Sequence, residues 1–339
     1  MLDESSRNLL HSVFHTLAYA DVFDYPLTAS EVYRYLTSIK GTFEEVTQAL
    51  SDKSLFSQSG EYFTLRGREA IVETRKRRAG VAARLWTKSA RYGRIIASLP
   101  FVRMVAITGS LAMNNTDEGK DVDYMIVTVP GHLWICRALA LLIARIAKLE
   151  GIQLCPNYLV TTNALVLKER SLYVAHELAQ MVPLSGMEIY DEMRQLNDWV
   201  YDYLPNASGA PQAHVMLSPS APLRINSTKH LRSGEPESSV VAPRCHSLTP
   251  SRRSFGRETF QKILEMFFSL PFGHWLEKWE MNRKIARLTR EQSHSFESYF
   301  SADVCKGHID RHGENVVTAL AVRLQLLPLP MGEGRGEGQ

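Results

Sequence analysis

The sequence predicts an α+β fold: a mixed sheet flanked by helices, with a small N-terminal domain and a helical C-terminal segment. Three observations lead to this prediction. The first 66 residues show three helical patterns and a hairpin, two strand patterns are joined by Gly109-Ser110 and a polar loop, and apolar residues recur at helical spacing after residue 255. The chain has 339 residues, and at roughly 100–200 residues per domain this length allows two or three domains.

The N-terminal domain is predicted over residues 1–66. Apolar residues from Leu9 to Phe23 have helical spacing, and the stretch Phe56–Leu65 alternates around a Ser-Gly turn as a hairpin does. Two capping boxes mark the starts of the second and third helices: Thr28 with Glu31, and Thr42 with Glu45. Three helices followed by a hairpin resemble a winged helix-turn-helix domain.

A winged-helix domain raises the question of DNA binding. The predicted third helix, from Phe43 to Lys53, carries Glu44, Glu45 and Asp52 against a single lysine. A helix that reads DNA needs cations and amides that reach phosphates and base edges. This helix would repel the DNA backbone, so a packing or dimerisation role is favoured and DNA binding is kept as the alternative.

A basic linker helix is predicted over residues 67–98. The whole chain has a net charge of only +3, which argues against a protein that coats nucleic acid. The segment from Arg66 to Arg94, however, contains ten Lys and Arg residues against two Glu. Two interpretations stay open: the helix attracts phosphate groups, or its long side chains only cover apolar surface.

The candidate catalytic residues lie in the next domain, which is predicted over residues 99–206. Met104–Thr108 and Val122–Val129 read as two strands, and Gly109-Ser110 begins a helix directly after the first. Residues i and i+2 of a strand share a face, so Asp121 and Asp123 present two carboxylates together. Mg²⁺ is the cation that such carboxylates bind jointly with substrate phosphates, while a glycine lets backbone N–H groups approach a phosphate closely.

This arrangement resembles the signature of the polymerase-beta-type nucleotidyltransferase superfamily, in which Gly-Ser is followed about ten residues later by Asp-hydrophobic-Asp. The matching residues are Gly109, Ser110, Asp121 and Asp123. The resemblance implies that Gly109 and Ser110 bind the nucleotide, and that the two catalytic aspartates bind Mg²⁺, with two ions possible. It further implies transfer of a nucleoside monophosphate from an NTP to an acceptor hydroxyl with release of pyrophosphate. The acceptor could be a small molecule, a protein or a nucleic acid.

Active members of that superfamily usually carry a third carboxylate on a later strand. The next strand pattern here, Gln153–Val160, contains no Asp or Glu, and Asn157 is the residue we assign to the matching position, as a metal ligand. An amide brings no negative charge and is a poor base; Glu169 and Glu177 are assigned to a turn and a helix. A second function therefore stays open: a catalytically weakened nucleotide-binding or DNA-associated regulator that keeps the fold.

The remaining segments are assigned from composition. Residues 207–254 are rich in Pro and Ser and lack aromatic residues, and residues 328–339 are rich in Pro and Gly, so both are predicted to be disordered. Residues 255–327 are predicted as a helical segment that packs on the preceding domain, with a polar connection around Cys305. The polar N-terminus and the charged residues within His132–Lys148 predict a cytoplasmic protein with no membrane partner.

Overall fold

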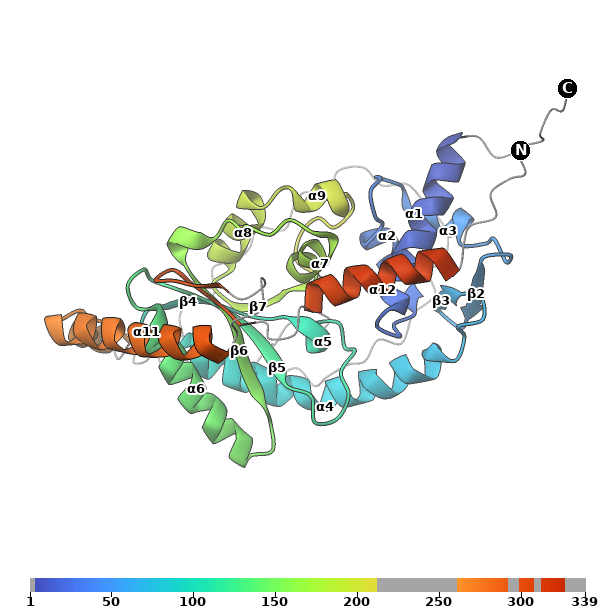
Figure 1. The fold of residues 1–339 in the computed structure, drawn as a ribbon. Coiled ribbons are helices and arrows are strands. Elements are labelled where there is room, and N and C mark those ends of the chain that lie inside the picture. Colours follow the sequence, from blue (N-terminus) through green and yellow to red (C-terminus); the bar gives the residue numbers. More distant parts are fainter. Residues whose placement is uncertain (1–3, 212–260, 292–298, 308–311, 327–339) are drawn as a thin grey trace, which may run out of the picture.

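We analysed the chain in a computed structural model, which describes residues 4–211, 261–291, 299–307 and 312–326 (Figure 1). The mixed α+β architecture is as predicted. Beyond residue 211 the predicted Pro- and Ser-rich linker lies outside the described residues. The same holds for the predicted tail at 328–339 and for the first residues of the predicted C-terminal segment, 255–260.

The N-terminal domain consists of three helices and a three-stranded antiparallel sheet in the order β1-β3-β2. Both predicted capping boxes are present, with the threonine and glutamate side chains bonding each other's backbone N–H groups. The third helix ends at Ala49, earlier than predicted. The elements are α1 (Glu4–Asp21), β1 (Leu27–Thr28), α2 (Ala29–Arg34), α3 (Phe43–Ala49), β2 (Phe56–Ser59) and β3 (Tyr62–Leu65).

The basic segment forms one long helix, α4 (Ile71–Ala97), which leads from the N-terminal domain to the central sheet (Figure 1). Gly93 allows it to pack closely on that sheet, because a Cβ there would lie 2.2 Å from Leu184 Cδ1. The buried hydroxyl of Tyr124 donates a hydrogen bond of 2.7 Å to the carbonyl of Ser89. These contacts pack α4 against the sheet, including the second strand of the predicted motif.

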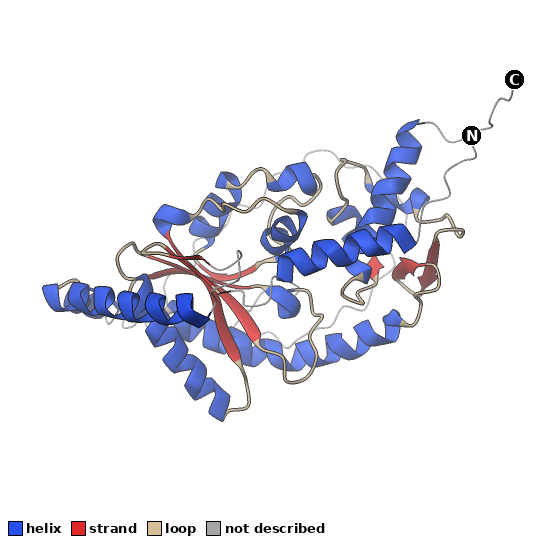
Figure 2. Ribbon diagram, in the orientation of Figure 1, coloured by secondary structure: helices blue, strands red, loops and turns tan. Residues whose placement is uncertain are grey.

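The central sheet has the order β7-β4-β5-β6-β9-β8, with β5 and β6 parallel and the other neighbours antiparallel. Helices cover both faces (Figure 2). Tyr124 and Ile126 point toward α4 and α6, whereas Met125 and Val127 pack on the α7–α9 side, as strand alternation requires. The elements are β4 (Val102–Ile107), α5 (Gly109–Ala112), β5 (Val122–Thr128), α6 (Leu133–Leu149), β6 (Leu154–Thr161), η1 (Thr162–Ala164), α7 (Leu172–Gln180), β7 (Val182–Ser185), α8 (Met187–Leu196) and α9 (Val200–Tyr203).

The C-terminal segment corrects the prediction in two ways. It is not wholly helical: besides helical residues 261–268, α11 (Pro271–Glu291) and α12 (His312–Leu326), it contains β8 (Tyr299–Phe300) and β9 (Val304–Lys306). The predicted polar connection therefore begins within a strand, β9, whose backbone pairs with the outer edge of β6. In addition, the C-terminal segment packs on both preceding domains. Glu277 of α11 accepts the first N–H groups of α6, and α12 contacts α7. Helix α12 contributes Val316 and Leu320 to the core of the N-terminal domain.

In the part of the chain that the structure describes, no helix combines the length and the apolar character that a membrane span requires.

Candidate active site

The two predicted aspartates lie together at the start of β5. Asp121 directly precedes the strand and Asp123 is its second residue, while Val122 and Tyr124 between and after them are buried in the core. The two carboxylates therefore share the open face, as predicted. The parallel register pairs Asp123 with Cys155 of β6, and ligand atoms of Asp121, Asp123 and Cys155 all lie within 4.8 Å of one another.

The electrostatics of this cluster favour a bound cation. Burial and the neighbouring charge of Asp121 raise the pKa of Asp123 to about 7, although hydrogen bonds from Cys155 and Asn157 oppose the shift. Burial and the two carboxylates raise the pKa of the Cys155 thiol to about 12, which keeps it a neutral donor. A hard divalent cation such as Mg²⁺ fits this set, because it prefers carboxylate oxygens and would remove the repulsion that raises the pKa of Asp123.

Gly109 lies directly against the Asp123 carboxylate. Its φ is +64°, a conformation that residues with a side chain rarely adopt, and a Cβ on it would lie 2.7 Å from Asp123 Oδ2. The N–H of Thr108 donates to the main-chain carbonyl of Asp123 at 3.1 Å, which fixes the turn to the strand. Ser110 lines the same cleft. The structure thus brings Gly109 and Ser110 to the two aspartates.

Asn157 also reaches the site, by way of a bulge in β6. The register runs from Tyr124 opposite Pro156 to Met125 opposite Tyr158, so Asn157 is an extra residue in its strand. Its side chain hydrogen-bonds the Asp123 carboxylate. The structure therefore brings Asn157 to Asp123, and its role as a metal ligand stays a prediction.

Sequence reasoning missed a third carboxylate, that of Glu177. It lies on α7, as expected, but this helix turns its side chain into the cleft that Asp121 and Asp123 line. Burial, followed by the negative charge of Asp123, raises the pKa of Glu177 to about 7, while Lys306 acts in the opposite direction. No spacing rule could have found it, because a residue on a later helix is brought to β5 only by tertiary packing.

The cleft itself lies between the sheet and the N-terminal domain and has a volume of about 690 Å³. One wall carries Gly109, Ser110 and the acidic residues, and the opposite wall is formed largely by aromatic side chains of the N-terminal domain. His176 of α7 stacks on the Tyr19 ring with the centroids 3.9 Å apart, and burial lowers its pKa to about 3. The aromatic residues of this wall are Tyr19, Phe23, Tyr25 and Tyr35.

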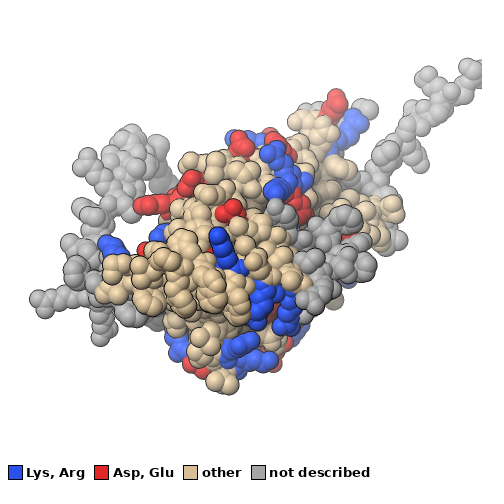
Figure 3. Space-filling model, turned by 60° about the vertical axis from the view of Figure 1, so that its left-hand side comes forward, with Lys and Arg blue, Asp and Glu red and all other residues tan. Residues whose placement is uncertain are grey.

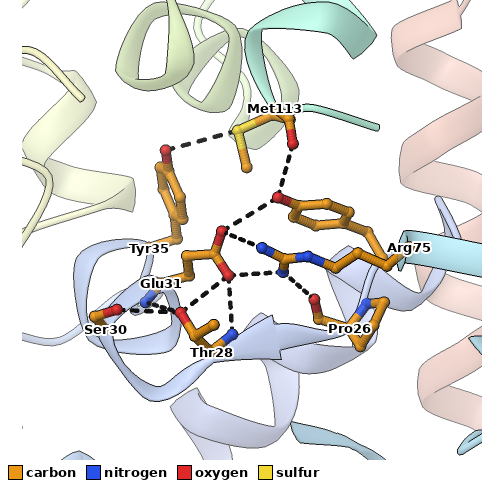
Figure 4. Close-up of polar contacts among 8 residues, drawn as sticks. Pro26, Thr28, Ser30, Glu31, Tyr35, Arg75 and Met113 are labelled. Atoms are coloured by element: carbon orange, nitrogen blue, oxygen red, sulfur yellow. Dashed lines mark hydrogen bonds and ion pairs between the residues drawn. The ribbon is translucent and has the colours of Figure 1, made fainter. Parts of the chain in front are cut away.

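A polar network fastens this wall to the Gly-Ser helix (Figure 4). Arg75 of α4 donates to both carboxylate oxygens of Glu31 at 2.7 and 2.8 Å, and it also donates to the carbonyl of Pro26. The Tyr25 hydroxyl then donates to the carbonyl of Met113, the residue that follows α5, at 2.8 Å. The N-terminal domain is thus tied to the end of the short helix that starts at Gly109.

The basic helix contributes less positive charge to the cleft than its sequence suggests. Arg91 pairs with Glu150, and neither Arg91 nor Arg94 lines the cleft. Most other cations of the basic segment from Arg66 to Arg94 also pair with carboxylates of neighbouring segments, which supports the packing interpretation of this segment. These pairs are Arg68 with Asp21 and Asp24, Arg75 with Glu31, Arg77 and Arg78 with Asp117, and Arg84 with Glu118.

Two cations do line the cleft, Arg78 and Lys120. Arg78 is held by Asp117 and by the carbonyl of Phe23, so its guanidinium mainly fixes the loop after α5. Lys120 is exposed and directly precedes Asp121, and among the described residues its ammonium pairs with no carboxylate. Elsewhere charges are mixed: on the face drawn in Figure 3, basic and acidic side chains lie among uncharged ones.

Comparisons of this chain with protein-family models, with curated proteins and with solved structures found no match.

Proposed function

We propose that the chain is a Mg²⁺-dependent nucleotidyltransferase of the polymerase-beta type, which transfers a nucleoside monophosphate from an NTP to an acceptor hydroxyl. The observation that supports this most strongly is the contact between Gly109 and Asp123. It places a turn that can approach phosphates beside a pair of carboxylates that suits a divalent cation. The mixed sheet flanked by helices is compatible with the fold that the sequence resemblance implies.

Different residues of the cleft have different roles in this reaction. Mg²⁺ bound by Asp121 and Asp123 would offset the negative charge of the phosphates during transfer. Gly109 and Ser110 would hold the phosphate chain, and Lys120 at the rim would add positive charge. The acceptor oxygen forms a bond to the α-phosphorus while the bond from that phosphorus to the bridging oxygen breaks, and pyrophosphate leaves with the electron pair.

Glu177 is the group that we assign to the acceptor's proton. It lines the same cleft as the aspartates, and the charge of Asp123 acts on it, so it supplies the third carboxylate that β6 lacks. A carboxylate can accept the proton as the acceptor oxygen attacks, whereas the amide of Asn157 cannot. We place the reaction in the cytoplasm, where the unpaired thiols of Cys136, Cys155 and Cys305 would stay reduced.

A label-transfer assay tests this function. The full chain is incubated with each α-³²P-labelled NTP, with Mg²⁺ or Mn²⁺ and with a cell extract as the source of acceptors. We expect transfer by the wild type and by Asp202→Asn, which changes an exposed carboxylate on α9, but not by the double variant Asp121→Asn/Asp123→Asn. Nucleotide binding without transfer would contradict the proposed enzymatic activity. It would favour the alternative function, a nucleotide-binding or DNA-associated regulator, which the amide of Asn157 in place of a carboxylate supports.

A further inference from the structure

A second cavity adjoins the cleft on the far side of Glu177. It has a volume of about 410 Å³, and it shares four lining residues with the cleft: Thr108, Asn157, Tyr173 and Glu177. Two of these contact Asp123, one through the N–H of Thr108 and the other through the side chain of Asn157. The wall shared by the two cavities therefore lies directly beside the acidic site.

The rest of the second cavity is mainly apolar. Met125 of β5, Leu178 and Met181 of the α7 region and Val304 of β9 line it. The ammonium of Lys306 and the carboxylate of Glu169, which also line it, neutralise each other in an ion pair of 2.6 Å. Such a cavity suits a small, uncharged molecule with an apolar body, because burial of an unpaired charge there would be costly.

The size and charge of this cavity also argue against a macromolecular acceptor. A volume of about 410 Å³ is in the range of small-molecule sites. A nucleic-acid strand would need cations that are available to its phosphates. Lys306 is already held by Glu169, and Lys168, the other cation that lines the cavity, also has an interaction partner.

We propose that the second cavity is the acceptor site, and that the acceptor is a small uncharged alcohol with an apolar body. This inference rests on the proposed function. The NTP occupies the cleft, and the alcohol enters from the other side with its hydroxyl directed at Glu177. As its oxygen bonds to the α-phosphorus and pyrophosphate departs, its proton passes to the Glu177 carboxylate. The product is the nucleoside monophosphate ester of the alcohol.

Two probes and one pair of variants test this assignment. Saturation-transfer NMR on the full chain measures binding of 2-phenylethanol, which is uncharged and largely apolar, against glycerol, which is polar throughout. Val166→Trp fills the second cavity from its rim, where Val166 is 50 % exposed, so the substitution is compatible with folding. Val322→Trp makes the same change at a residue that is 46 % exposed on α12 and lines neither cavity.

We expect the wild type and Val322→Trp to bind 2-phenylethanol in preference to glycerol, and Val166→Trp to bind it at least tenfold more weakly while it still binds ATP. With Mg²⁺ and α-³²P-labelled ATP, label should pass to 2-phenylethanol in the first two proteins only. No binding by the wild type, or equal binding by the two variants, overturns the acceptor site even if label passes to acceptors in a cell extract. Binding of 2-phenylethanol without transfer to any acceptor overturns the proposed function, and the acceptor assignment with it.

Discussion

A comparison of Gly109→Ala with Gly119→Ala separates the cost of backbone strain from damage to the acidic site. Gly109 has φ +64° and Gly119 has φ +77°, so an alanine at either position costs about 1–2 kcal/mol of folding free energy. Restriction of the unfolded chain offsets this by up to about 1 kcal/mol. The surroundings differ: a Cβ on Gly109 lies 2.7 Å from Asp123 Oδ2, whereas one on Gly119 has no atom within 4 Å. Gly119→Ala is thus the matched control.

The carboxylate of Asp123 would have to move by about 0.7 Å in Gly109→Ala to restore an ordinary contact of 3.4 Å. A displacement of this order at a reacting centre can cost roughly a hundredfold in rate. We therefore expect both variants to lose similar stability in urea denaturation. Mg²⁺ should raise the melting temperature of the wild type and of Gly119→Ala, but not that of Gly109→Ala. Equal stabilisation of the two variants by Mg²⁺ would refute the proposed contact between the Gly-Ser turn and the metal site.

Three further predictions concern the site and its supports. The pKa of Asp123 is raised from 3.8 to about 7, so this group's contribution to the stability of the metal-free protein should be lost as the pH rises from 4 to 7. Metal-free Asp123→Asn should therefore lose less stability than the wild type over this range, and Mg²⁺ should raise the melting temperature of the wild type more at pH 8 than at pH 6; a pH-independent shift would argue against this carboxylate as a ligand. Glu277→Ala leaves two N–H groups at the start of α6 without their acceptor, and urea denaturation should show a loss of about 1–3 kcal/mol. Arg75→Met breaks an ion pair in which the arginine is only 12 % exposed, and it should lower the free energy of unfolding by about 1.5–3 kcal/mol. Arg77→Met, at an arginine that is 58 % exposed, should lower it by less than about 1 kcal/mol. Similar losses in the two variants would contradict the importance of the Glu31 network.

The parts of the site that are close in sequence could be predicted from it. Gly109 and Ser110 begin α5 directly after β4, and Asp121 and Asp123 lie at the start of β5, the strand that pairs with β4. Local periodicity is therefore enough to bring these four residues together. Asn157 could be assigned because β6 directly follows the crossover helix α6 and pairs with β5. Local rules of strand and helix formation control all of these placements.

The remaining features depend on tertiary packing and left no local pattern. Glu177 reaches the cleft through the packing of α7, and Lys306 reaches the second cavity because a C-terminal strand adds to β6. The basic helix was harder to interpret because a sequence count cannot show that Asp117 and Glu150 come from elsewhere to pair with its arginines. The closure of the cleft by the N-terminal domain likewise depends on contacts such as that of Tyr25 with Met113.

The position of a bound cation and nucleotide tests the central claim most directly. Crystals of the full chain grown with Mn²⁺ and a non-hydrolysable NTP analogue would locate the cation by its anomalous scattering. We predict Mn²⁺ coordinated by carboxylate oxygens of Asp121 and Asp123, with the analogue's phosphates between this cation and the Gly109-Ser110 turn. A cation bound elsewhere, or a nucleotide whose phosphates lie away from Gly109, would contradict the assignment of this cleft as a nucleotidyltransferase site.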